Sequence, residues 1–201
     1  NVELTIKSGK KILYRDFGEM MFTHTGITGP LVLSASAVIG RRLQKEGRLD
    51  AFIDLKPALS FEQLDERILK EFENSRNRQF KNVIDVLFPS SLTPVIIGLG
   101  GIPADKVIHE ISREERQHFA SVIKAFPFTI IGLGRYSEAV ITKGGVSVKE
   151  IQPGTMESKK ISGLYFIGEL LDLDALTGGF NLQIAWSTAY LAGTAVSENN
   201  I

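Results

Sequence analysis

The periodicity of hydrophobic and polar positions changes along the 201-residue chain. Near the start, Val2, Leu4 and Ile6 alternate with polar residues, and a Ser8-Gly9-Lys10 turn leads to a second strand-like stretch that ends at Phe17. This pattern predicts a β-hairpin over residues 1–17. Residues 30–42 carry apolar side chains at helical spacing, with Pro30 in the first turn, where proline is tolerated. Residues 52–55 form a short apolar run that predicts one more strand.

The middle of the chain, residues 59–127, has mainly helical periodicity. Ser60 with Gln63, and Ser112 with Glu115, stand at the spacing of a capping box. Apolar residues follow each of these starts at intervals of three and four, so two amphipathic helices are expected. Shorter apolar groups at 83–88 and 91–99 predict two further helices, the second ended by Gly100-Gly101.

Strand-like composition returns after residue 127. Short apolar stretches predict strands at residues 129–131, 139–141, 146–148 and 164–167. Residues 153–160 have the composition of an exposed linker. The last apolar stretch, from Asn181 to Val196, predicts a helix with Asn181 as a candidate N-cap. Gly178-Gly179 comes just before it, and bare backbone beside unpaired helix N–H groups can bind an anion or a polarised carbonyl.

Composition and charge narrow the classes of function. Hydrophobic residues make up 43% of the chain and charged residues 23%, which suffices for a packed core. The 23 basic and 23 acidic residues cancel, which favours neither nucleic acid nor a membrane surface as a partner. The chain has no cysteine, so disulfides and thiolate catalysis are excluded. No apolar run approaches the roughly 20 residues of a membrane span, and we expect a cytoplasmic protein.

The histidines are the candidates for proton transfer and metal binding. His24 lies beside the glycines that precede the helix at Pro30. It fits an acid, base or hydrogen-bond donor near a ligand, and equally a structural turn whose imidazole satisfies backbone groups. His109-Glu110 begins like a zinc-binding H-E-x-x-H, but residue 113 is Arg. No metal is therefore expected.

Several motifs in a fixed order resemble those of a known family. They are FTHTGITGP at 22–30, TKGGV at 142–146, TMESK at 155–159, and the long stretch from Gly163 to Gly193. Together they resemble the YhiN/BaiN-like family of NAD(P)/FAD-dependent flavoprotein oxidoreductases, also called aminoacetone oxidase-like, over about residues 15–193. Within the motifs, Phe180 stands where the family commonly has Tyr, and Thr28 where it commonly has Ser.

The resemblance implies an α+β fold with two parts. An insert domain would cover residues 1–133, β-rich over 1–58 and mainly helical over 59–127. Residues 134–201 would be the C-terminal segment of a Rossmann-like FAD domain of the two-dinucleotide-binding type. The G-x-G-x-x-G fingerprint of such a domain does not occur in this sequence. We therefore expect the C-terminal half of a longer protein, inactive alone, whose partner is the missing N-terminal Rossmann half.

The resemblance also implies FAD as cofactor, NAD(P)H as electron donor and a small-molecule substrate. It is compatible with a protein that forms a homo-oligomer. The residues implied to contact the flavin are Gly144, Gly145, Val146, Gly168, Glu169, Gly178, Gly179, Phe180, Asn181, Leu182 and Gln183. Glu169 would bond the ribityl or nearby flavin hydroxyls. The helix start near Asn181 would face the pyrimidine end of the isoalloxazine, where negative charge grows on reduction. His24 is the candidate catalytic residue.

Two other functions remain open on the sequence. The chain could be an interaction module that keeps a flavoprotein-derived fold without its chemistry. It could also be a non-flavin enzyme whose glycine-preceded helix starts, near Gly29 and Gly179, bind a phosphorylated substrate. The second alternative predicts thermal stabilisation by phosphate in the absence of FAD.

Overall fold

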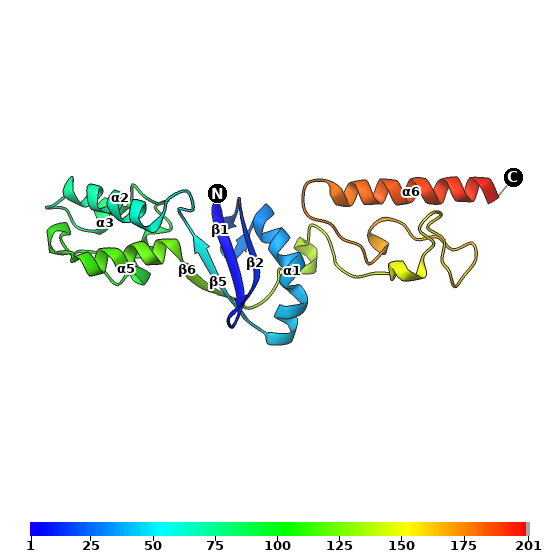
Figure 1. Ribbon diagram of the computed structural model, residues 1–201, viewed down its shortest axis with the longest axis horizontal. Helices are drawn as coiled ribbons and strands as arrows, with labels where there is room; N and C mark the ends of the chain where they lie inside the picture. The colour runs from blue at the N-terminus through cyan, green and yellow to red at the C-terminus, as the bar shows by residue number, and fades with distance from the viewer. Residues whose placement is uncertain (200–201) are drawn as a thin grey trace. The chain divides into compact units, whose positions relative to one another are not determined.

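A computed structural model describes residues 1–199, which form two compact units (Figure 1). The first unit comprises residues 1–31 and 41–131, and the second comprises residues 32–40 and the chain from residue 132 onward. The final two residues of the predicted segment 134–201 lie outside the described residues. The α+β fold class is confirmed, because sheets and helices are both present.

An antiparallel four-stranded sheet forms the centre of the first unit. Its strand order is β2 (Lys11–Gly18), β1 (Val2–Ser8), β5 (Leu49–Asp54) and β6 (Phe126–Ile130). Leu4 lies opposite Ile53 and Ile6 opposite Ala51, and all four side chains are at most 1% exposed. The alternation read from the sequence therefore lines one buried face, as period-two side chains must. The predicted hairpin and the predicted strands at 52–55 and 129–131 are confirmed.

Helix α1 (Pro30–Glu46) begins where the backbone is crowded. Gly29 has φ +109°, and a Cβ there would lie 3.0 Å from the Cα of Met20, so glycine is required at this N-cap. Before it, β3 (Met21–Phe22) pairs with β4 (Ile27–Thr28) in a two-stranded ladder. The ring of Phe22 meets that of Phe126 edge-on at 6.1 Å. The ladder that follows β2 thus reaches β6, the opposite edge strand of the sheet.

Four α-helices and one 3₁₀ helix form an excursion between β5 and β6 (Figure 1). They are α2 (Phe61–Glu73), α3 (Lys81–Ile84), α4 (Thr93–Gly100), η1 (Ile108–Glu110) and α5 (Arg113–Lys124). Both predicted capping boxes are present, with the N–H of Gln63 donating to Ser60 Oγ and the N–H of Glu115 to Ser112 Oγ, each at 3.2 Å. These caps are local sequence signals, which explains why the helix starts could be predicted.

Aromatic rings hold the helical excursion together. Phe80, which is fully buried, packs edge-on against Phe72 at 6.1 Å and against Phe119 at 5.1 Å. Such pairs contribute about 0.5–1.5 kcal/mol each beyond burial of their area. Gly100, at the end of α4, lies so close to Phe119 that an added Cβ would stand 2.7 Å from a ring carbon.

The second unit contains little regular structure besides one long helix. Residues 132–179 form three single-turn 3₁₀ helices, η2 (Tyr136–Glu138), η3 (Val148–Glu150) and η4 (Gly168–Leu170). Helix α6 (Phe180–Asn199) follows and agrees with the prediction for residues 181–196. The predicted strands at 139–141, 146–148 and 164–167 are wrong, since only isolated bridges occur, at Val146 and at Tyr165. None of the described helices is long and apolar enough to cross a membrane.

Two glycines of α4 are expected to respond oppositely to the same substitution. Gly100→Ala places a methyl group against the buried Phe119 ring and should lower the free energy of unfolding by about 1–3 kcal/mol. Gly98→Ala has open space around its Cβ and should raise it by about 0.5–1 kcal/mol, because alanine is the better helix former. Urea denaturation measures both. Equal signs for the two variants would contradict the close packing of α4 on α5.

The ion pair between α2 and α5 predicts a pH dependence of stability. Arg116 donates from Nε and Nη2 to the Asp65 carboxylate at 2.7 and 3.1 Å, and the two side chains are 14% and 16% exposed. These hydrogen bonds hold the pKa of Asp65 below its ordinary value. The resulting stability is complete above about pH 5 and is lost as the pH falls below about 4, toward the folded-state pKa.

Asp65→Asn should therefore lower the free energy of unfolding at pH 7 by about 1.5–3 kcal/mol and flatten its dependence on pH below 5. Urea midpoints measured at pH 7 and at pH 3.5 test this. Asp105→Asn, at an exposed carboxylate, is the matched control. A pH slope that Asp65→Asn leaves unchanged would count against the assigned role of the pair.

Candidate functional site

Two loops of the second unit close on each other at Gly145. The N–H of Val146 donates to the carbonyl of Leu170, and the N–H of Asp172 donates to the carbonyl of Val146, both at 2.8 Å. Gly145 has φ +143°, and a Cβ on it would stand 2.5 Å from the Leu170 oxygen. Backbone of the same chain therefore fills the space beside this glycine. The family motif TKGGV here serves the joining of two loops.

A second pair of loops surrounds Met156. Gln152 accepts from the Met156 N–H and donates its own N–H to Glu157, each at 2.8 Å, while Tyr165 forms an isolated bridge with Glu157. Met156 is 8% exposed and packs with Ile151, Leu171 and Ala192. Its φ of 60° makes it the one residue other than glycine with positive φ among residues 1–199. The predicted exposed linker at 153–160 is confirmed at 153–154 and 159–160, which are exposed, and is wrong at Met156, which is part of this core.

Gly168 fixes the loops to helix α6. Its N–H donates to Thr188 Oγ1 at 3.0 Å, and Thr188 in turn donates to the Ile184 carbonyl at 2.7 Å. A Cβ on Gly168 would already touch Ala185 at 3.5 Å. The small side chain of Ala185 permits this close approach between α6 and the 3₁₀ turn η4. Thr188 was missed by sequence reasoning, since a threonine inside a helix gives no signal of its own.

The start of α6 leaves backbone donors open. Gly178 and Gly179 have φ of +114° and +88°, and nothing lies within 4 Å of a Cβ built on Gly179. The first helical hydrogen bond runs from the N–H of Gln183 to the carbonyl of Gly179 at 3.1 Å. Within the described part of the chain, the N–H groups of Phe180, Asn181 and Leu182 have no acceptor.

The expected capping by Asn181 is wrong, because its side chain is occupied elsewhere. Asn181 Oδ1 accepts from the Ala175 N–H at 2.9 Å, and its Nδ2 donates to the Ala175 carbonyl at 3.0 Å. This pair of bonds shapes the loop in front of the helix. The uncapped N–H groups and the partial positive charge of the helix end stay available to a ligand.

Some polar side chains of this region already have hydrogen-bond or ion-pair partners, and others have none among the described residues. Gln183 donates to Ser187 at 3.1 Å, and Lys143 pairs with Asp174 at 3.3 Å. Glu169 is exposed in η4, and its carboxylate bonds to no described residue. Glu169 is thus the open hydrogen-bond acceptor among the predicted flavin contacts. All eleven predicted contacts, from Gly144 to Gln183, belong to the second unit.

His24 belongs to the first unit. It lies in a tight turn closed by the Thr23 N–H, which donates to the Gly26 carbonyl at 2.8 Å. Its imidazole is exposed and makes no hydrogen bond with the described residues, so a role in satisfying backbone groups is not seen. A catalytic role stays a prediction.

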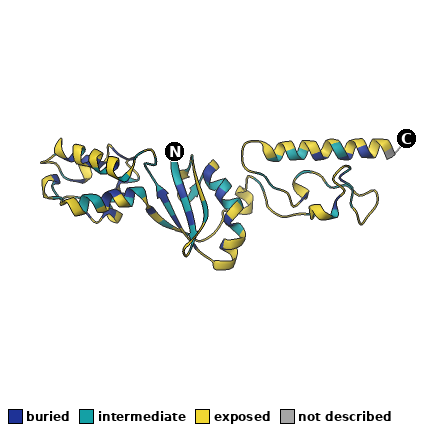
Figure 2. Ribbon diagram, in the orientation of Figure 1, coloured by how far each residue is buried: buried dark blue, intermediate teal, exposed yellow. Residues whose placement is uncertain are grey.

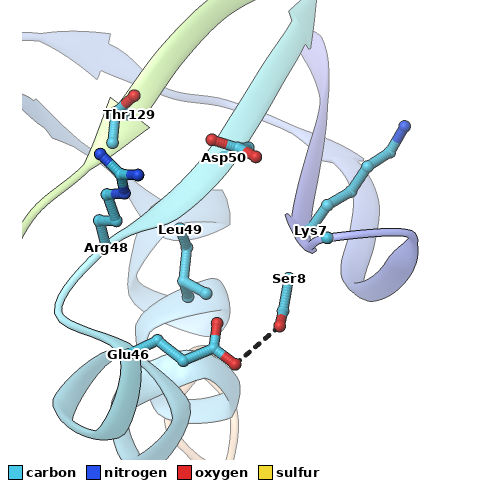
Figure 3. A pocket seen from close by; sticks show the side chains of 8 residues that line it. Lys7, Ser8, Glu46, Arg48, Leu49, Asp50 and Thr129 are labelled. Carbon is cyan, nitrogen blue, oxygen red and sulfur yellow. Dashed lines mark hydrogen bonds between the residues drawn. The ribbon is translucent and has the colours of Figure 1, made fainter.

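A polar depression of about 420 Å³ opens beside the sheet of the first unit, where Lys7, Arg48 and Asp50 line it and Ser8 donates to Glu46 at 2.8 Å (Figure 3). Its charges are mixed, and Arg42 also pairs with Glu46. In residues 1–199 no three His, Asp or Glu side chains group as metal ligands would, and the expectation of no metal stays a prediction.

Comparison with known proteins shows where the chain belongs. The model of the family described as "HI0933-like protein barrel and H2TH domain" matches residues 1–141, well over half of the chain. This chain belongs to the HI0933-like family. It is the YhiN/BaiN-like family that the motifs resemble. Both the sheet of the first unit and the helices α2–α5 lie within the matched HI0933-like region.

Curated HI0933-like relatives cover nearly the whole chain. Over 98% of its length, this chain is 36% identical to the ribosomal RNA dihydrouridine synthase of Haemophilus influenzae, and the match covers 46% of that protein. It is 30% identical over 94% of its length to the 3-dehydro-bile acid delta(4,6)-reductase of Clostridium scindens, again covering 46% of that protein. A ribosomal RNA dihydrouridine synthase of Escherichia coli is 34% identical over 85% of the chain and is 40% covered. The chain thus spans about half the length of these relatives.

Gly145 offers a test of how the second unit closes. Gly145→Ala should destabilise the contact between residues 144–146 and 170–172 by about 1–3 kcal/mol more than Gly144→Ala, because both have positive φ but only the first meets backbone atoms. Amide hydrogen exchange of Val146 and Asp172 measures the opening. Equal acceleration in the two variants would show that positive φ alone is responsible.

Proposed function

We propose that this chain is the C-terminal part of an FAD-dependent oxidoreductase that takes electrons from NAD(P)H in the cytoplasm. The observation that carries the proposal is the uncapped start of α6, preceded by Gly178 and Gly179 with positive φ. Its open N–H groups and bare backbone suit a flat ligand with a polarised, electron-rich edge. Family membership supports the same reading.

The names of the relatives support a reduction. One is a dihydrouridine synthase and another a delta(4,6)-reductase. Both names describe a reaction whose product has fewer double bonds than its substrate. We therefore propose that the compound that accepts the electrons contains a double bond that is reduced. The sequence predicts a small-molecule substrate, and the name of the second relative, a bile acid reductase, agrees with such a substrate. We therefore keep a small molecule as one kind of acceptor in the proposal.

The flavin, when bound, supplies the hydride or electron transfer. The N–H groups of Phe180, Asn181 and Leu182 would hold its pyrimidine end and stabilise negative charge there. The open Glu169 carboxylate would accept hydrogen bonds from hydroxyl groups of the cofactor. Gly144 and Gly179, around which a Cβ would meet nothing, leave room for a ring to lie on the backbone. His24 would hold or move a proton at the substrate.

Helix α6 carries an apolar stripe that indicates a further part of the protein. Leu182, Trp186 and Tyr190 follow one another at four-residue intervals and are 60%, 67% and 75% exposed. Much of the ribbon of α6 has the colour of exposed residues in Figure 2. A helix face of this kind is normally covered in a folded protein. Since the chain spans about half the length of its relatives, we propose that the Rossmann half expected before this chain covers the stripe and holds the FAD phosphates.

A visible absorption spectrum tests this proposal. The 201-residue chain purified alone, and the longer gene product that contains it, are each mixed with FAD and freed of unbound cofactor. We expect a bound-flavin spectrum, bleached by NADH or NADPH, in the longer product only. Absence of flavin from both would overturn the oxidoreductase proposal. Thermal stabilisation by phosphate instead would favour a phosphate-binding enzyme, and no response to either ligand would favour an interaction module.

The start of α6 can be tested in the same experiment. Gly179→Ala in the longer product forces a side chain into positive φ, at a cost of about 1–2 kcal/mol, and should weaken FAD binding about tenfold. Gly154→Ala, in an open loop of the same unit, should leave FAD binding unchanged. Equal affinities in the two variants would mean that α6 does not hold the cofactor.

A further inference from the structure

A turn between α2 and α3 gathers positive charge and amide groups on one exposed surface. Residues 74–82 have the sequence NSRNRQFKN, which we call the basic turn (Figure 1). It contains Arg76, Arg78 and Lys81 and no carboxylate. Eight of its nine side chains are exposed or partly exposed, and all eight are cations, amides or a hydroxyl. The overall neutrality of the chain conceals this local excess of positive charge.

The backbone of the basic turn is held in place by a facing segment, residues 104–109. The N–H of Phe80 donates to the Lys106 carbonyl at 2.9 Å, and the N–H of Ile108 donates to the Arg78 carbonyl at 3.1 Å. The N–H groups of Lys81 and His109 add bonds at 3.0 and 3.2 Å to Ala104 and Arg76. Phe80 anchors the turn in the aromatic core. The outward side chains thus project from a fixed frame.

The cations of the basic turn are unpaired among the described residues, as are Arg67, Lys70 and Arg113 on the adjoining helices α2 and α5. Lys106, Arg116 and Lys124 each have a carboxylate partner, in Glu115, Asp65 and Asp54. Within the described part of the chain, Arg76, Arg78 and Lys81 form no ion pair, although Glu73 and Asp85 flank the turn in sequence. Their charge is therefore available to an external anion.

We propose that the basic turn binds RNA, with Arg76, Arg78 and Lys81 on phosphates and the amides of Asn77, Gln79 and Asn82 on base edges or sugar hydroxyls. Cations spaced along an exposed turn suit a chain of phosphates, and interleaved amides supply the donors and acceptors that bases require. The names of two relatives specify ribosomal RNA. The inference concerns binding without turnover, so its test does not depend on the proposed flavin chemistry.

Binding of fluorescein-labelled fragments of purified ribosomal RNA to the full-length protein tests the inference. The variant Arg76→Gln/Arg78→Gln/Lys81→Gln should bind at least tenfold more weakly at about 0.1 M salt. The slope of log K against log salt concentration should fall in magnitude by about 2, since each phosphate contact on single strands contributes about 0.7. Flavin content and thermal melting should match wild type, because the changed side chains are exposed.

A control variant, Lys10→Gln/Lys11→Gln/Lys45→Gln, removes the same charge from other exposed positions and should bind RNA almost as well as wild type. Three results would overturn the inference: no binding of RNA by wild type, equal losses in the two variants, or equally reduced binding of heparin. The last would show a general polyanion surface. Loss of flavin with RNA binding intact would instead count against the proposed redox function alone.

Discussion

The second unit depends on a backbone that must close on itself without a sheet. Residues 132–179 contain three single turns of 3₁₀ helix, and their loops are joined by isolated bridges and paired hydrogen bonds. Such joining requires positions where two backbones almost touch. Gly145 permits one of them, and Gly168 permits the contact with α6. Glycines in a flavoprotein motif are readily attributed to the ligand, and here two of them first serve the fold.

The same residues explain how far the sequence could predict the structure. The hairpin and the helix starts at Ser60 and Ser112 depend on neighbours in sequence, so their patterns were sufficient. The apolar run at 164–167 predicts a strand, but a strand also needs a partner, which composition does not reveal. Met156 was placed in a linker because no pattern shows that a residue with positive φ will be buried. Asn181 has the composition of a cap, yet the loop at Ala175 uses its side chain first.

The candidate site was located by resemblance more than by pattern. A pair of glycines before a helix is common, and the sequence alone could not say that the N–H groups behind it would be left uncapped. The exposure of Leu182, Trp186 and Tyr190 could not be predicted from the sequence either, because apolar residues at helical spacing normally predict a core. The net charge was also a poor guide to binding surfaces. The 23 positive and 23 negative residues sum to zero, and this sum does not show that cations gather in the basic turn.

The route of the chain into and out of the helical excursion has an evolutionary consequence. The excursion leaves β5 and returns to β6, and Ile53 and Phe126 at its two ends are direct partners in the sheet. The Leu55 N–H donates to the Ile123 carbonyl at 3.0 Å, and Lys124 pairs with Asp54 across the same neck. A short hairpin loop could bridge these ends with little change to the sheet. The helices can therefore be remodelled, enlarged or deleted as one cassette without disturbing the pairing of β5 with β6.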